Sequence, residues 1–368
     1  MASEGDEAPA LRAHGGLIDD ELRALRIDPE AVLDVSVNVN PYGTSKRVLA
    51  AIRSAPVDRY PDPTAAPARR AIAEHLKTNA DRVVLGNGAV DLLWTAARAL
   101  LEPGATALVV EPAFSELGAA VRASGGRLVR WRAREEDGFA VDLPAVGEAI
   151  RREGARLVYL CSPANPTGVV VDEREFAAFA GAHPEVLFLF DQAFASLSDR
   201  PEALKGALPA NVVALRSMTK EHAIAGVRVG YALAAPGIAA RLERGRPPWS
   251  TSALAQEAAI AAIREEPYVE ACRQRILADR DRLRARLREV GLAPFPSATL
   301  YFLLPVADAG RARSALLRDA RVLTRDCTSF GLPAMLRICA RPARDEERLV
   351  AALARLHELH PIAAPRNA

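Results

Sequence analysis

Short apolar runs alternate with stretches of helical periodicity through the middle of the chain. Several of these runs are continuously hydrophobic, which is typical of strands that helices cover on both faces of an α/β sheet. Amphipathic helices are predicted between them, for example over residues 89–101 and 173–182. Seven strands are expected, over residues 82–87, 106–112, 127–133, 156–163, 186–192, 212–218 and 227–234. The last two are joined by a connection too short for a crossover helix, so they are expected to pair antiparallel.

The pattern changes after residue 240. A proline-rich break is followed by a long helical stretch over residues 252–290 and then by a smaller α/β unit. The first 45 residues are rich in loops and too short to form a domain. We therefore expect an N-terminal arm over residues 1–45, a large domain over 46–245 and a small C-terminal domain over 246–368.

The composition is that of an ordinary globular protein. Of the 368 residues, 50% are hydrophobic and 26% are charged, which suits one large two-lobed subunit with a sizeable core. The 48 basic and 46 acidic residues leave a net charge of only +2, and aromatic residues make up 5%. Binding to nucleic acid would need a net basic face with aromatics, so no nucleic-acid partner is expected.

The N-terminus and the cysteines predict the compartment. The N-terminus is acidic without an apolar core segment, and no apolar run reaches membrane-spanning length, so neither a signal peptide nor a membrane partner is expected. The four cysteines are widely spaced, without a CxxC pair or a histidine partner. We expect reduced thiols, no metal site and a cytoplasmic protein.

Lysine is scarce in this chain, which makes each lysine informative. Only four of the 48 basic residues are lysines: Lys46, Lys77, Lys205 and Lys220. Lys220 follows the apolar run 212–218. A lysine that is desolvated at a strand end has a lowered pKa and forms an imine with an aldehyde, whereas a surface lysine lays its stem along apolar side chains. Arginine fills nearly every ordinary surface position here and cannot form an imine, so the composition favours the chemical role.

A glycine turn precedes the predicted helix 89–101. A strand runs into Gly86, Asn87 and Gly88, and Ala89 opens the helix. Free amides at a helix N-terminus, approached closely because glycine has no side chain, can cradle a phosphate. The stretch lacks the third glycine of a dinucleotide fingerprint, and alone such a turn is more often only a turn.

Polar residues also follow two other predicted strands. Asn165 lies in the turn NPTG after strand 156–163, where its amide can donate a hydrogen bond to a ligand, although loop chemistry alone also explains the turn. Asp191 follows five apolar residues, so its carboxylate is expected at the edge of a buried strand and needs a cationic partner. That partner could be an arginine or a protonated heterocyclic nitrogen.

One cofactor would account for these features together. An aldehyde would bind Lys220, and a phosphate would bind the glycine turn and Arg228, which lies eight residues after Lys220. A ring hydroxyl would meet Asn165, and a ring nitrogen would meet Asp191. These are the requirements of pyridoxal 5'-phosphate (PLP), so we expect a PLP-dependent enzyme.

A set of motifs spreads over nearly the whole chain. In order they are NVNPYG, RYPDP, GNGAVD, EPAF, NPTG, DQAF, SMTKEHAIAGVRVGY and TRDCTSFGLPAMLRICAR. With them the chain resembles fold-type-I PLP enzymes of the class I/II aminotransferase superfamily, in the branch of histidinol-phosphate aminotransferase and L-threonine-O-3-phosphate decarboxylase. The resemblance implies an aspartate-aminotransferase-like fold, with a mostly parallel seven-stranded sheet between helices and a smaller C-terminal α/β domain. It also implies a homodimer with shared active sites.

The resemblance assigns roles to the residues that match these motifs. Lys220 would be the Schiff-base lysine and the proton shuttle, and Asp191 would pair with the pyridine nitrogen. Tyr60 would reach the phosphate in the neighbouring subunit. The other cofactor contacts would be Gly88, Ala89, Phe114, Asn165, Ser217 and Arg228. Substrate contacts would come from His14, Asn40, Tyr42, Arg325 and Arg337, with Arg337 forking onto a carboxylate.

The reaction stays open because transamination and decarboxylation use the same residues. The early HGG at residues 14–16 and Trp249 in PPWS resemble the decarboxylase, whereas base rates in the superfamily favour transamination. We expect first an aminotransferase acting on a small amino acid or amino phosphate, with the decarboxylase or a specialised PLP enzyme of secondary metabolism as alternatives. SMTK also matches the SxxK of acyl-enzyme hydrolases, but no lysine follows Lys220 to complete their motifs.

Four positions depart from the family pattern. Gln192 replaces an acid, and Phe194 lacks the hydroxyl that aminotransferases offer the cofactor. Ser252 and Leu300 stand where asparagines are usual. Each departure removes a polar group expected near cofactor or substrate, which argues against the phosphate-bearing substrates of both relatives.

Overall fold

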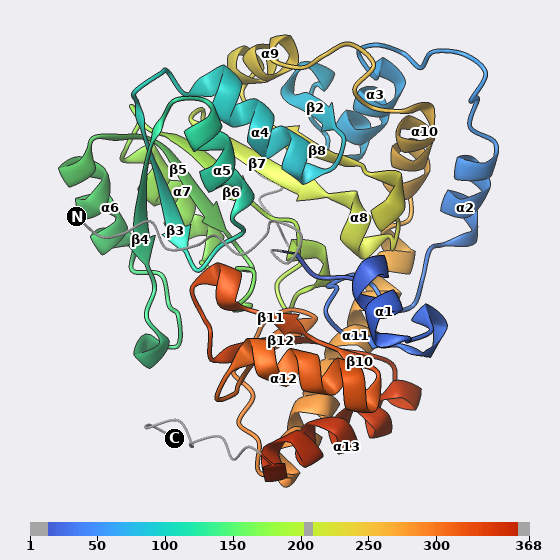
Figure 1. The fold of residues 1–368 in the computed structure, drawn as a ribbon. Helices are drawn as coiled ribbons and strands as arrows, with labels where there is room; N and C mark the ends of the chain where they lie inside the picture. The colour runs from blue at the N-terminus through green and yellow to red at the C-terminus, as the bar shows by residue number, and fades with distance from the viewer. Residues whose placement is uncertain (1–13, 202–208, 360–368) are drawn as a thin grey trace. The chain divides into compact units, whose positions relative to one another are not determined.

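The computed structural model describes residues 14–201 and 209–359, which belong to two compact units (Figure 1). The sheet unit comprises residues 39–277 and 296–300. The terminal unit comprises the described residues of 1–38, 278–295 and 301–368. Throughout the described ranges, no helix has the length and apolar character that crossing a bilayer requires.

The sheet unit is built on a seven-stranded sheet in the order β2-β8-β7-β6-β5-β3-β4 (Figure 1). The neighbours from β4 to β7 run parallel, while β8 pairs antiparallel with both β7 and β2. The seven expected strands and the antiparallel pairing of the last two are therefore confirmed. The strands are β2 (Val83–Gly86), β3 (Thr106–Glu111), β4 (Arg127–Arg132), β5 (Ala155–Cys161), β6 (Leu187–Asp191), β7 (Val212–Ser217) and β8 (Gly230–Leu233).

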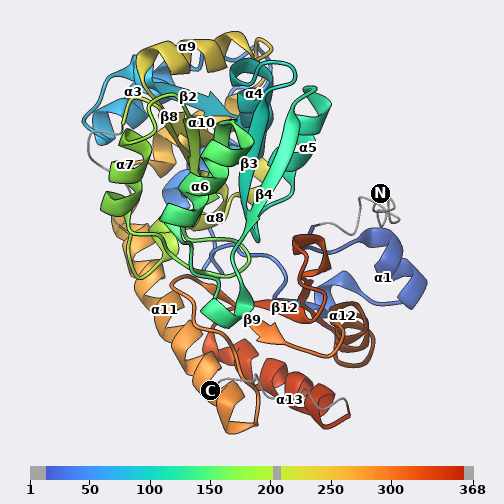
Figure 2. The same cartoon turned by 90° about the vertical axis from the view of Figure 1, so that its left-hand side faces the viewer.

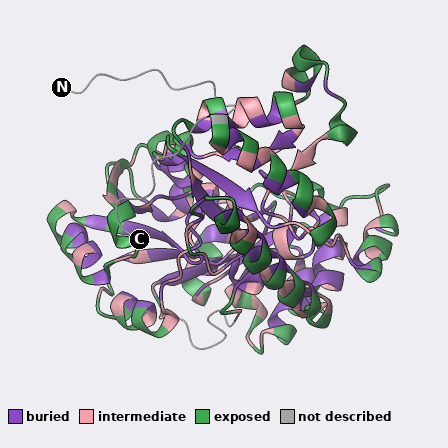
Figure 3. Cartoon of the chain, turned by 90° about the horizontal axis from the view of Figure 1, so that it is seen from below, coloured by how far each residue is buried: buried purple, intermediate pink, exposed green. Residues whose placement is uncertain are grey.

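Helices cover both faces of the sheet because each strand presents apolar side chains to both sides. In β6, Leu189 belongs to a cluster with α4, α5 and α9, whereas Phe188 and Phe190 belong to a cluster with α6 and α7. Figure 2 shows the sheet between these two sets of helices, and Figure 3 shows that helices of the protein carry buried residues beside exposed ones. The helices are α4 (Ala89–Leu100), α5 (Glu116–Ala123), α6 (Leu143–Glu153), α7 (Glu173–Gly181) and α9 (Pro236–Arg244).

The helical stretch expected over residues 252–290 is two helices, α10 (Ala253–Ala262) and α11 (Glu266–Glu289). Pro267 lies in the first turn of α11, where proline is accepted, but it could not lie inside a continuous helix. The interruption follows from this residue.

α10 packs with α2 (Lys46–Arg53) and α3 (Ala66–His75) in a cluster that also contains residues of β2 and β8. Its N-terminus is capped by Ser252, whose hydroxyl accepts a hydrogen bond from the amide of Ala255 at 3.2 Å. α10 is thus part of the sheet unit, although residues from 246 onward were expected in the C-terminal domain. The division between the units falls inside α11.

The terminal unit combines segments from both ends of the chain. β11, β12 and β9 form an antiparallel sheet, and β1 pairs parallel with β10. Glu21 of α1 accepts two hydrogen bonds from Arg313 of α12, each of 2.6 Å. Residues 14–38 thus lie with the C-terminal elements, and the expected arm over 1–45 is divided between the units. The elements are α1 (Asp19–Leu25), β1 (Leu33–Asp34), β9 (Tyr301–Pro305), α12 (Ala309–Ala315), β10 (Val322–Leu323), β11 (Arg325–Asp326), β12 (Met335–Cys339) and α13 (Ala343–Leu359).

Candidate active site

Six strands of the sheet run the same way and end at one edge, and most of the expected cofactor residues follow five of them. β3, β5, β6 and β7 are parallel, and β2 runs the same way because β8 is antiparallel to both β7 and β2. Cys161 at the end of β5 is the register partner of Asp191 at the end of β6. Gly230 is the register partner of both Ser217 and Gly86. The carboxyl ends of parallel strands are where α/β folds bind ligands.

Asp191 and Ser217 point to the sheet face that α4 and α5 cover. Side chains two residues apart share a face of a strand, and Leu189 and Leu215 belong to the cluster with α4 and α5. Phe114, from the loop after β3, packs against the same cluster. The carboxylate, the hydroxyl and the aromatic ring therefore lie on one side of the sheet.

The carboxylate of Asp191 is buried and held at both oxygens. Its Oδ2 accepts a hydrogen bond from the hydroxyl of Tyr159 at 2.8 Å, and its Oδ1 accepts one from the amide of Ala193 at 2.9 Å. Burial raises the pKa of Asp191, while these two hydrogen bonds and the charge of Lys220 lower that pKa. A carboxylate in this setting is stabilised by a further cation at the strand end.

Lys220 lies on α8 (Met218–Glu221), a helix of four residues that is too short to be stable alone. Asn40 holds this helix, because its backbone amide donates to the carbonyl of Lys220 and its side-chain amide donates to the carbonyl of Glu221, both at 2.9 Å. The hydroxyl of Thr44 donates to the carbonyl of Ala223, also at 2.9 Å. The segment around Asn40, which the resemblance placed at the substrate, thus fixes the backbone that carries Lys220.

α4 begins at the glycine turn, and its first turn is open to a ligand. Gly88 is its N-cap residue with a φ of 82°, a conformation that residues with a side chain rarely adopt. A Cβ atom on Gly88 would lie 2.5 Å from Nη2 of Arg228, and one on Gly230 would lie 2.9 Å from the amide nitrogen of Ala89. Among the described residues, no side chain caps this helix, so its first amides are available to an anion.

Ser217 and Arg228 lie beside the glycine turn. Nη1 of Arg228 donates to the carbonyl of Ala225 at 2.9 Å, which fixes the guanidinium beside the glycine turn. Ser217 is paired in register with Gly230, whose backbone lies against the amide of Ala89. A hydroxyl, a guanidinium and helix amides are thus gathered at one place, and this donor set fits a phosphate dianion.

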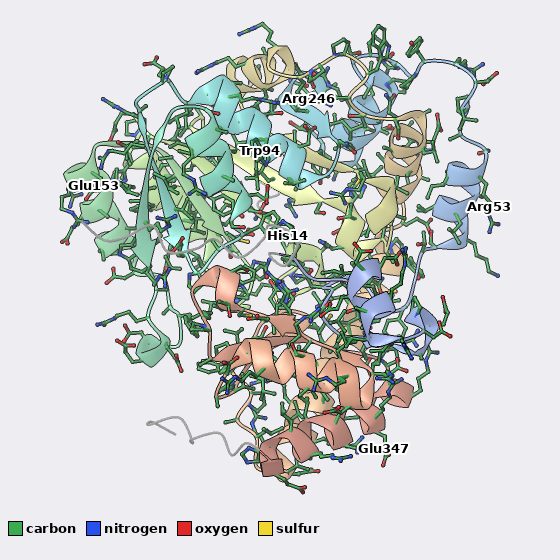
Figure 4. All side chains as sticks on the ribbon, in the orientation of Figure 1. His14, Arg53, Trp94, Glu153, Arg246 and Glu347 are labelled. Carbon is green, nitrogen blue, oxygen red and sulfur yellow. The ribbon has the colours of Figure 1, made fainter. Side chains whose placement is uncertain are left out.

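The helix that carries the cradle is held before any ligand binds. Trp94 of α4 (Figure 4) donates from Nε1 to Glu116 of α5 at 2.9 Å. Asp91, in the first turn of α4, accepts a hydrogen bond from the amide of Asn87 at 3.0 Å and lies 3.9 Å from Nε of Arg246. These contacts keep the cradle in one position, as a preorganised binding site requires.

Asn165, Tyr42 and Tyr60 lie at three different places in the sheet unit. Asn165 follows β5, and its backbone amide hydrogen-bonds to the thiol of Cys161, the register partner of Asp191. The ring of Tyr42 lies under the guanidinium of Arg275, at 3.7 Å from its central carbon. Tyr60 is 80% exposed at the surface of the sheet unit.

The remaining expected substrate residues lie in the terminal unit. Arg325 and Arg337 face each other across β11 and β12, and both are buried. Arg337 donates to the carbonyl of Ser36 at 2.5 Å. The segment after His14 (Figure 4) reaches the same residue, because the amide of Gly16 donates to the hydroxyl of Ser36 at 2.8 Å.

The two buried guanidiniums influence each other. Burial, together with the neighbouring charge of Arg337, lowers the pKa of Arg325 to about 10. Arg325 is anchored by a 2.7 Å hydrogen bond to the hydroxyl of Ser329. Two adjacent cations in a buried site are typical of a site for an anion.

The four departures from the family pattern have packing roles. Gln192 donates to Glu173 at 2.8 Å, and Ser252 caps α10. Phe194 and Leu300 are buried. These positions therefore contribute to stability in this chain, whatever their role in relatives.

Sequence reasoning missed Tyr159 and Glu221. The hydroxyl of Ser196 donates to the carboxylate of Glu221, which joins the loop after β6 to the residue next to Lys220. Tyr159 lies in an expected strand, and its alternation with Cys161 could have placed both on one face. The contact with Asp191 depends on the register between β5 and β6, which the sequence does not show.

The family model of class I and II aminotransferases matches residues 30–356. The chain belongs to this family and is an aminotransferase-like enzyme. It is 34% identical to histidinol-phosphate aminotransferase of Halobacterium salinarum over 349 residues, which cover 91% of this chain and 94% of the relative. It is also 34% identical to histidinol-phosphate aminotransferase 2 of Pseudomonas aeruginosa over 366 residues, which cover 97% of each chain.

The chain is also similar in structure to a solved aminotransferase. Histidinol-phosphate aminotransferase from Sinorhizobium meliloti, in complex with pyridoxal-5'-phosphate, superposes with a TM-score of 0.84 at 27% identity, covering 97% of this chain and 99% of the other. The superfamily and the aspartate-aminotransferase-like fold that the motifs indicated are confirmed.

The burial of Asp191 predicts a stability change in the cofactor-free protein. Asp191→Asn is expected to raise the free energy of unfolding at pH 7.5 by about 1–2 kcal/mol, because the substitution removes a charge that burial disfavours. The folded-state pKa is raised above the unfolded one, so the native wild type takes up the proton first as the pH falls. The advantage of the variant should therefore shrink as the pH falls through that raised pKa.

Urea unfolding at a series of pH values measures this difference. Asp81→Asn, at an exposed position, is the matched control and should change the free energy of unfolding little. A wild type that is more stable than Asp191→Asn at pH 7.5 would contradict the account of this carboxylate.

Proposed function

We propose that the protein is a PLP-dependent aminotransferase whose substrate is a small amino compound with an anionic group, first of all an amino phosphate of the histidinol phosphate type. The observation that carries the proposal is the placement of Lys220 and the buried carboxylate of Asp191 at the same sheet edge as the phosphate cradle. The cysteines support a reducing compartment such as the cytoplasm, since all four are buried and form no disulfide within the described residues.

The donor set of the sheet unit fits PLP. PLP supplies an aldehyde that condenses with amines and a ring that withdraws electrons from the substrate carbon. The amides at Gly88 and Ala89, the hydroxyl of Ser217 and the guanidinium of Arg228 bind its phosphate. Asp191 would keep a proton on the ring nitrogen, Asn165 would donate to the ring hydroxyl, and Phe114 would pack on the ring.

Lys220 has two tasks. With the cofactor bound, its Nζ would be the atom that holds the cofactor, and the same amine would take up the proton at the substrate's α-carbon. Both tasks need an amine that returns to one place, and the hydrogen bonds of Asn40 to the backbone of Lys220 and Glu221 provide that.

The guanidiniums of Arg325 and Arg337 bind the anionic group of the substrate. Two adjacent guanidiniums match a phosphate dianion better than a single carboxylate, since each can donate two hydrogen bonds. His14 would contribute from the segment whose Gly16 amide reaches Ser36 beside Arg337. Asn40 and Tyr42 would contribute from the segment that hydrogen-bonds to the backbone of Lys220 and Glu221. This arrangement favours an amino phosphate even though the departures in sequence argued against one.

A second copy of the chain covers Tyr60. The ring of Tyr60 lies 4.9 Å from that of Trp249, and both rings are exposed, as is the nearby Val57. Exposed apolar side chains gathered in this way are typical of a protein interface. In the homodimer Tyr60 reaches the phosphate bound by the other subunit.

The function is tested by mixing the PLP-loaded protein with single substrates and no acceptor. Histidinol phosphate should convert the cofactor to its amine form, seen as loss of the long-wavelength absorbance. Release of CO₂ from O-phosphothreonine without the amine form would establish the decarboxylase instead. Lys220→Ala should abolish turnover of every substrate, and a variant that still turns over would refute the role of Lys220.

If Arg325 and Arg337 bind the substrate, their substitution should change KM more than kcat. Arg325→Lys and Arg337→Lys should each raise KM for the anionic substrate about tenfold or more with a smaller effect on kcat, because lysine keeps the charge but loses the paired hydrogen bonds. Arg344→Lys is the control, since Arg344 is 79% exposed in the same unit. An unchanged KM in both variants would contradict the assignment.

A further inference from the structure

The phenol of Tyr159 is placed beside the carboxylate that the cofactor needs. Tyr159 on β5 is the register partner of Leu189 on β6, so it lies diagonally across from Asp191 on the same face of the sheet. Its side chain is fully buried, and its hydroxyl donates to Oδ2 of Asp191 at 2.8 Å.

The hydroxyl is not needed for packing. Tyr159 belongs to an apolar cluster with Leu157, Leu189 and Leu215, in which a phenylalanine ring would fill nearly the same volume. Burying a hydroxyl in such a cluster is unfavourable unless it makes a hydrogen bond, and here the bond goes to a carboxylate. A hydrogen bond to a charged acceptor is among the stronger ones in a protein interior.

We propose that Tyr159 is a positioning residue that keeps Asp191 ionised and oriented, and through Asp191 keeps the ring nitrogen of the bound cofactor protonated. The inference rests on the proposed function, because it needs PLP at this site. It adds a residue to the reaction that touches neither cofactor nor substrate.

The physical reason is the sharing of one proton between Asp191 and the ring nitrogen. A donor to the carboxylate stabilises the state in which the proton is on the nitrogen. Burial alone raises the pKa of Asp191 and favours the opposite state, and the hydroxyl of Tyr159 counteracts that effect. Without the hydroxyl the proton moves toward the carboxylate, and the ring withdraws electrons less well.

The other groups near Asp191 do not take over the hydrogen bond that Tyr159 donates to Oδ2. The amide of Ala193 already occupies Oδ1 of Asp191. The thiol of Cys161 donates to the carbonyl of Pro163 at 3.2 Å, and burial raises the pKa of that thiol, which keeps it neutral. Lys220, whose charge also favours ionised Asp191, becomes part of the covalent link to the cofactor.

The test loads the wild type and two variants with PLP labelled with ¹⁵N in the ring and records the nitrogen resonance at one pH. In Tyr159→Phe the resonance should move toward the position of neutral pyridine, and kcat should fall about tenfold. Tyr231→Phe is the matched control, because Tyr231 is also buried but belongs to the cluster with α3 and α10. Its resonance should stay at the wild-type position.

A second substitution covers the case in which Tyr159→Phe does not fold. Replacement of Tyr159 by 3-fluorotyrosine keeps the ring and makes the phenol a stronger donor, so the resonance should move the opposite way, toward the fully protonated position. A wild-type resonance in either loaded variant, or an equal shift in Tyr231→Phe, would overturn the proposal.

The experiment distinguishes failure of the proposed function from failure of the role of Tyr159. A wild type that takes up no PLP would overturn the proposed function and this inference with it. A wild type that binds PLP at Lys220, with a nitrogen resonance indifferent to Tyr159, would overturn only the role of Tyr159.

Discussion

A charged carboxylate among apolar strands is the constraint on which the site depends. Asp191 ends a strand whose preceding residues are buried on both faces, and burial raises its pKa. An ionised group there is retained only where donors and cations surround it. Tyr159 and Ala193 hold its two oxygens, and Lys220 supplies the nearby charge. These residues surround a carboxylate that is buried and that, in the proposed function, acts in its ionised form.

The same constraint explains the architecture around it. Parallel strands bring their carboxyl ends to one edge, so groups distant in sequence meet there without long loops. Glycines at positions 86, 88 and 230 let α4 approach that edge and offer its amides. α8 has only four residues, and the hydrogen bonds of Asn40 to its backbone supply the rigidity that a longer helix would have provided. Contacts with the surrounding elements thus stabilise a site whose buried charge is unfavourable by itself.

Much of this was predictable from sequence, for identifiable reasons. The strands were predicted because their apolar runs are continuous, and Lys220 was conspicuous because arginine is used almost everywhere else. The sequence did not predict that residues 14–38 belong to the terminal unit. The pairing of β1 with β10 leaves little signal, because each strand has two residues and the two lie far apart in sequence. The roles of Tyr159 and Asn40 depend on register and on backbone contacts, which leave no compositional signal.

The central claim is that Lys220 holds the cofactor, and the scarcity of lysine makes it directly testable. The protein is incubated with PLP, reduced with borohydride, digested, and its peptides are analysed by mass spectrometry. The chain has four lysines, so each possible attachment can be distinguished. The account predicts stoichiometric reduced cofactor on the peptide that contains Lys220. Cofactor on Lys46, Lys77 or Lys205 instead, or on no peptide, would contradict it.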